Sequence, residues 1–132
     1  MRRLFITFAL LAACKGEAAA RCDHCGMKLD PKSPFATEMI DGAKTEHFDT
    51  SRCALSEWLA HGKRGTVRVQ DYYDRKMRPA SEVEFVVGSD VVGPMGPDLV
   101  PVDAPRVAKF EKDHGGTHAF ALADIDEKAL QP

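Results

Sequence analysis

FATEMIDGAKTEHF, residues 35–48, is the stretch that decides the fold. Residues 35–40 and 43–48 are each rich in strand-forming side chains, and Asp41-Gly42 between them is typical of a tight hairpin turn. The stretch therefore predicts two antiparallel strands joined by a short turn.

A helix and a third strand are predicted directly after this hairpin. Asp49 is a candidate helix cap, Leu55, Trp58 and Leu59 form an apolar helical face, and His61-Gly62 ends the helix. Thr66-Val-Arg-Val69 then gives the next strand, with Asp71-Tyr-Tyr-Asp74 after it. The order of elements is ββαβ.

The second half of the chain repeats this order. Its expected elements are strands at 83–87 and 99–102, a helix that is capped by Asp103 and carries Val107 and Phe110, a His-Gly-Gly stop at 114–116, and a strand at 117–122. A shared order of four elements indicates a duplicated unit. We expect an α+β fold of two small tandem ββαβ modules, residues 22–71 and 72–132.

The N-terminus has the features of a bacterial lipoprotein signal. Arg2-Arg3 precedes an apolar run at residues 4–13 that is too short to span a bilayer, and Leu11-Ala-Ala-Cys14 follows. Residues 1–13 would then be a cleaved signal peptide, Cys14 the lipidated first residue, and residues 14–21 a tether. With Lys15 after Cys14, a diderm host would be expected to send such a protein to the outer membrane by default. We therefore expect a lipid-anchored protein on the periplasmic side of the envelope.

The charge balance argues against a nucleic-acid partner. Cleavage of the signal would remove two of the 18 basic residues and none of the 20 acidic ones. The remaining composition is that of an ordinary globular protein with room for one compact domain or two very small ones.

Three thiols remain if Cys14 is lipidated, and two of them lie in Cys22-Asp-His-Cys-Gly-Met27. This stretch combines thiolates, an imidazole and a thioether, a soft ligand set that favours Cu(I). Cys22, His24, Cys25 and Met27 are thus candidate ligands. Cys53 is expected to lie in the core beside Leu55 and Trp58, as buried free cysteines often do.

Met95 is the tip of a Gly/Pro-rich connection, Gly93-Pro-Met-Gly-Pro97, which replaces the short turn of the first half. Little apolar sequence surrounds it. A thioether on such a loop indicates a metal ligand or a docking contact.

Together these motifs resemble the NosL family of copper-binding lipoproteins. The resemblance is carried by Cys14, Cys25-Gly-Met27, Phe48-Asp49, Gly93-Pro-Met-Gly96 and Gly115-Gly116. It implies a monomeric extracytoplasmic protein of two ββαβ modules, which supplies Cu(I) for the copper-sulfide centre of nitrous-oxide reductase. Its implied partner is the maturation complex of that enzyme, which includes an ABC transporter and an associated periplasmic protein.

Carried over by position, the resemblance makes Cys25, Met27 and Met95 the metal ligands, with Cys22 and His24 as possible additional ones. A Cys22–Cys25 disulfide remains an alternative, as do a CxxC thiol-disulfide oxidoreductase, a structural zinc site that uses Cys53, and a general envelope copper carrier. No nucleophile–base set or carboxylate pair stands out in the sequence, so we expect a protein that is not an enzyme.

Overall fold

The computed structural model describes residues 19–131. The predicted signal peptide, the lipidated Cys14 and most of the tether lie outside the described residues. Within the described part of the chain, no helix has both the length and the apolar character needed to cross a membrane.

The first half of the chain forms a four-stranded antiparallel sheet in the order β2-β1-β3-β4. Its strands are β1 (Thr37–Asp41), β2 (Lys44–Phe48), β3 (Thr66–Gln70) and β4 (Met77–Pro79). Asp41 pairs with Lys44, and Gly42 has a φ of +60°, so the hairpin turn is Gly42-Ala43, one residue later than expected. Strand β4 was not predicted; it pairs with β3 and extends the first sheet beyond residue 71.

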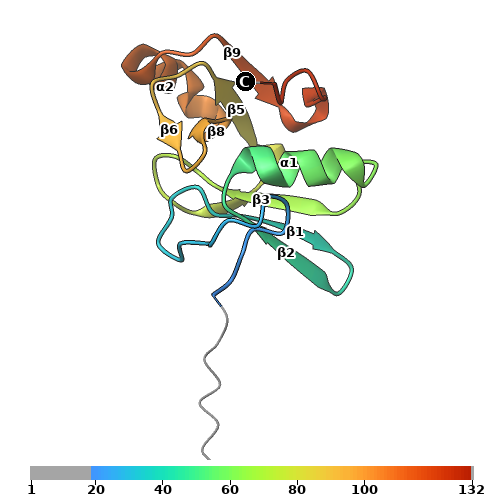
Figure 1. The fold of residues 1–132 in the computed structure, drawn as a ribbon. Helices are drawn as coiled ribbons and strands as arrows, with labels where there is room; N and C mark the ends of the chain where they lie inside the picture. Colours follow the sequence, from blue (N-terminus) through green and yellow to red (C-terminus); the bar gives the residue numbers. More distant parts are fainter. Residues whose placement is uncertain (1–18, 132) are drawn as a thin grey trace, which may run out of the picture.

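Helix α1 (Ser51–Ala60) lies over this sheet and contacts β1, β2 and β3 (Figure 1). Its predicted cap was wrong by one residue. The side-chain oxygen of Thr50 accepts a hydrogen bond from the Cys53 amide at 3.2 Å, which satisfies one of the free N–H groups of the first turn. The Asp49 carboxylate points instead toward the neighbouring cysteines. The predicted end at His61 is confirmed.

The second half forms a three-stranded antiparallel sheet in the order β8-β5-β9. Its strands are β5 (Val83–Val87), β8 (Val100–Asp103) and β9 (His118–Ala121), with the hairpin β6 (Val92–Gly93) and β7 (Gly96–Pro97) between β5 and β8. Asp103 does not cap through its side chain; a 3₁₀ turn at Ala104–Arg106 leads into α2 (Val107–His114). Helix α2 ends at Gly115, where φ is +72°.

Both halves place their first strand at the centre, with the hairpin partner on one side and the strand after the helix on the other. The predicted α+β class and the repeated ββαβ order are confirmed. The halves share one core, since Phe48 and Leu55 belong to the same buried cluster as Phe85 and Ile125. A smaller cluster around Phe110 lies under α2.

Asp71 fixes the join between the halves. Its side chain is fully buried and accepts hydrogen bonds from the amides of Tyr73, Asp74 and Asp103 at 3.0, 2.9 and 2.6 Å. Arg106 lies 3.7 Å from the same carboxylate. One buried carboxylate thus ties the loop after β3 to the end of β8.

Candidate metal centre

The Cys22–Met27 segment is a closed loop that rests on the end of β2. The Cys22 amide donates to the Met27 carbonyl at 2.8 Å, and the Gly26 amide donates to the Cys22 carbonyl at 2.9 Å. Gly26 has a φ of +76°, which explains a glycine at this position. Asp23 holds the loop to His47 through two hydrogen bonds, one from each backbone amide. The loop therefore presents its thiols in a fixed place.

Four side chains meet under this loop: Cys22, Cys25, Asp49 and Cys53. Their ligand atoms all lie within 4.8 Å of one another. Cys22 and Cys53 are both 3% exposed, whereas Cys25 is half-buried. All three thiols are free, and Cys25 Sγ lies 3.5 Å from an Asp49 carboxylate oxygen. The group is a candidate metal centre with two deep thiols and one at the mouth.

The surroundings of these thiols favour the protonated form. Burial raises the pKa of Cys25, opposed by a backbone hydrogen bond at Met27 and reinforced by Cys22 and Asp49. Burial also raises the pKa of Cys53 strongly, although a hydrogen bond with Thr50 opposes the rise. At neutral pH these two groups are thiols, so a metal ion that binds them must displace their protons.

The hairpin β6–β7 carries Met95 to this cluster. Gly93 pairs with Gly96, so Pro94-Met95 forms the tip. Met95 is 55% exposed, yet its Sδ lies 3.8 Å from Cys53 Sγ. Arg52, the residue before Cys53, donates to the Pro97 carbonyl at 3.4 Å and to the Leu130 carbonyl. Helix α1 therefore holds both the hairpin and the C-terminal segment.

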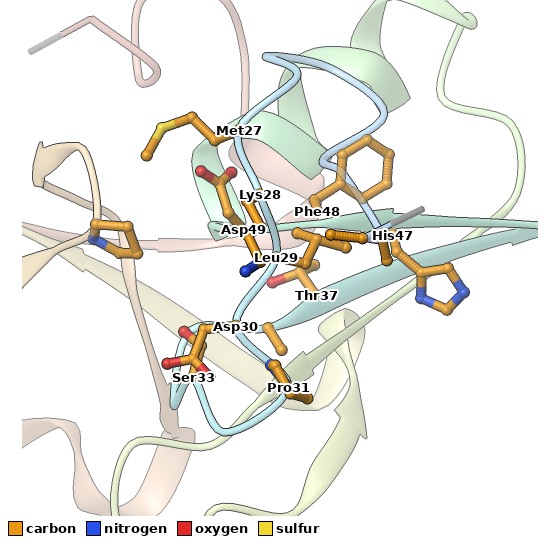
Figure 2. Close-up of a pocket in the computed structure, with 14 residues that line it drawn as sticks. Met27, Lys28, Leu29, Asp30, Pro31, Ser33, Thr37, His47, Phe48 and Asp49 are labelled. Atoms are coloured by element: carbon orange, nitrogen blue, oxygen red, sulfur yellow. The ribbon is translucent and has the colours of Figure 1, made fainter. Parts of the chain in front are cut away.

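Met27 lies at the edge of an apolar pocket of about 660 Å³ beside the cluster. Asp49 and Pro94 also line this pocket, which continues along residues 28–37 to Phe48 (Figure 2). Met27 is 40% exposed. The two candidate thioether ligands, Met27 and Met95, thus belong to exposed residues. The Met95 sulfur contacts Cys53, and Met27 lines the same pocket as Asp49.

His24 points away from this arrangement. Its Nδ1 lies 2.6 Å from a carboxylate oxygen of Glu57 on α1, and the described metal-binding group does not include it. This contact fastens the loop to α1. A ligand role for His24 remains a prediction.

Comparison with known proteins places the chain in a family. A model of the NosL family matches residues 13–130. The chain belongs to the NosL family. Its structure is similar to the crystal structure of the copper chaperone NosL from Shewanella denitrificans, with a TM-score of 0.69 and 21% sequence identity over 83% of this chain and 91% of that one. At this identity the likeness shows the shared fold. No curated protein matches the sequence.

Within this NosL chain, sequence reasoning missed Asp49 and Cys53 as members of the centre. Asp49 was assigned to the helix cap and Cys53 to the core. Cys53 is indeed buried in the core cluster, but it also faces the other thiols. The one usable signal was that Phe48-Asp49 is among the motifs that carry the family resemblance.

Proposed function

We propose that this protein is an extracytoplasmic Cu(I) chaperone that carries the ion at the mouth of its cysteine cluster. Cys25 supplies the anionic ligand, while Met27 and Met95 supply neutral thioethers. The protein binds and hands over its cargo and is not an enzyme. Family membership supports this proposal, and the structural neighbour is itself named a copper chaperone.

One observation carries the choice of metal: the sulfur of the exposed Met95 lies 3.8 Å from the sulfur of Cys53, which is one of three clustered free thiols. Thiolate and thioether are soft ligands, and together they select Cu(I) over hard cations. Partly exposed thioethers also suit a carrier, because a recipient can reach an ion that they hold.

Zinc is the second candidate, and Asp49 is the reason. Three thiolates and one carboxylate form a four-membered set of the kind that tetrahedral Zn(II) accepts. A zinc site of this composition would make no use of Met27 or Met95. The contact between Met95 and Cys53 therefore favours copper.

We further propose that the recipient is the copper-sulfide centre of nitrous-oxide reductase, reached through the ABC-transporter complex that matures this enzyme. The apolar pocket beside Met27 supports contact with a protein partner, since a single ion needs far less than about 660 Å³. Lipidation at Cys14 would hold the monomeric chaperone at the periplasmic face of the membrane, in diderm cells the outer membrane by default.

An anaerobic titration of the reduced protein tests the binding step. Cu(I) is supplied with a chromogenic Cu(I) chelator as competitor, and the titration is repeated with Zn(II). We expect one Cu(I) per chain, bound more tightly than by the chelator, with much weaker Zn(II) binding. Cys25→Ser should lower the Cu(I) affinity. Stronger binding of Zn(II) would assign the centre to zinc, and failure to compete for Cu(I) would overturn the chaperone proposal.

A further inference from the structure

The proposed Cu(I) site at the mouth of the cluster, here called the outer site, consists of Cys25, Met27 and Met95. Cys22 and Cys53 belong to the same cluster but are not ligands of the outer site. Both are 3% exposed and lie deeper than Cys25. They come from different elements, Cys22 from the N-terminal loop and Cys53 from α1. Cys22 lies near Cys25 in the same loop, whereas the approach of Cys53 to both is a product of the fold.

The spacing of the three sulfur atoms suits a metal ion with three ligands. Their Sγ atoms lie within 4.8 Å of one another. With metal–sulfur bonds of about 2.3 Å, a trigonal site requires sulfur atoms about 4 Å apart. The existing cluster is therefore close to the spacing that one ion with three sulfur ligands requires.

The side chain of Asp49, beside the cluster, points the same way. The Asp49 carboxylate is buried, and its Oδ1 has no hydrogen-bond partner. No lysine, arginine or histidine atom within the described residues forms an ion pair with Asp49. A buried polar atom without a hydrogen-bond partner is costly. An acceptor in this state, directly beside the thiols, is a candidate site for a proton that a metal ion displaces from them.

We propose that Cys22, Cys25 and Cys53 form an inner Cu(I) position, in which the ion rests before it moves outward. This inference rests on the proposed function. Cys25 is shared by the two positions, and the contact between Cys53 Sγ and Met95 Sδ joins the inner one to the exposed hairpin. The ion then moves by exchange of sulfur ligands, with no change in its oxidation state.

A double variant, Cys22→Ser/Cys53→Ser, tests the inner position in the purified reduced protein. Its Cu(I) affinity is measured by competition with the chelator. We expect the Cu(I) affinity to fall by about a hundredfold or more. Mutation of a residue that only supports a metal ligand already lowers metal affinity by about ten- to a hundredfold, and this variant removes two ligands. Ala54→Ser is the matched control, since it places a hydroxyl at a fully buried position of the same helix outside the cluster. It should bind Cu(I) like the unmodified protein.

X-ray absorption at the copper edge gives a second readout that does not depend on the folding of the serine variant. Met27→Leu/Met95→Leu changes two exposed side chains and is loaded with one Cu(I) per chain. An inner position predicts three sulfur neighbours at about 2.3 Å. An ion held by the outer site alone would retain a single sulfur.

The outcomes separate the two proposals. Suppose that the unmodified protein binds Cu(I). Unchanged affinity in a folded Cys22→Ser/Cys53→Ser variant, or a single sulfur neighbour in the methionine variant, would then overturn the inner position and leave the chaperone proposal intact. Absence of Cu(I) binding by the unmodified protein would overturn both.

Discussion

The sulfur of Met95, on an exposed hairpin, lies 3.8 Å from the sulfur of Cys53, which is buried on α1. The two residues are far apart in the sequence, and Arg52 holds them together through the Pro97 carbonyl. This contact links the surface to the interior of the cysteine cluster. Under the proposed function, Met95 is the point at which the ion leaves the protein.

Met95→Leu should therefore slow Cu(I) transfer. Leucine keeps the size and apolar character of the side chain but removes the sulfur. We expect the rate of transfer to an acceptor to fall by about tenfold, within the range found for mutations around metal sites. Stopped-flow mixing of the Cu(I)-loaded protein with a Cu(I) chelator measures this rate. Met77→Leu in β4 is the control, and an equal loss in both variants would contradict a specific role for Met95.

Thr50→Ala should destabilise the fold by about 1 kcal/mol, because the Cys53 amide loses the side-chain oxygen that caps α1. Chemical denaturation followed by circular dichroism measures the free energy of unfolding. Thr50→Ser keeps a hydroxyl at the same place and should recover most of the loss. If Thr50→Ala and Thr50→Ser unfold alike, the cap contributes nothing measurable.

Asp71→Ala should cost about 3 kcal/mol or more of unfolding free energy. It leaves three backbone amides without their acceptor at the join of the two halves, and each unsatisfied buried donor costs about 1–3 kcal/mol. Urea denaturation measures the loss. Asp124→Ala, at an exposed position, is the control and should stay within about 0.5 kcal/mol of the unmodified protein. A similar small effect at Asp71 would show that water replaces its contacts.

The repeated ββαβ order was predictable from the sequence because it depends on local signals. Alternating side chains, Gly42 in the hairpin and Gly115 after α2 all act within a few residues. Strand β4 escaped prediction because it has only three residues and contains Pro79. Such a segment carries little pattern of its own, and its pairing with β3 is decided by tertiary contacts.

The candidate centre was predictable only in part, for the same reason. Cys22 and Cys25 stand out because they are close in sequence, and Met95 stands out because of the glycines and prolines around it. The residues around Cys53 in the sequence do not indicate that it lies beside Cys22 and Cys25. Its position depends on how α1 packs against the N-terminal loop, a contact between distant segments. The role of Asp49 was hidden because aspartate before a helix usually indicates a cap.

Asp98 should make the stability of the fold depend on pH. This carboxyl group lies at the base of the Met95 hairpin and is 6% exposed. Burial raises its pKa to about 6, although the Leu99 amide and Arg52 oppose the rise. The folded state therefore binds a proton that the unfolded state releases between the ordinary pKa of aspartate, about 4, and a pH of about 6. Across that window the contribution of Asp98 to stability falls as the pH rises.

Asp98→Asn removes this dependence, because the amide stays neutral at every pH and still offers an oxygen to the Leu99 amide. The variant should gain stability relative to the unmodified protein when the pH is raised from 4 to 7.5. The raised pKa sets an upper limit of about 3 kcal/mol for this gain. Urea denaturation of both proteins at the two pH values measures it, and the comparison cancels the titration of all other groups. A difference between the two proteins that is the same at pH 4 and pH 7.5 would show that the Asp98 carboxyl ionises in the folded state as it does in the unfolded chain.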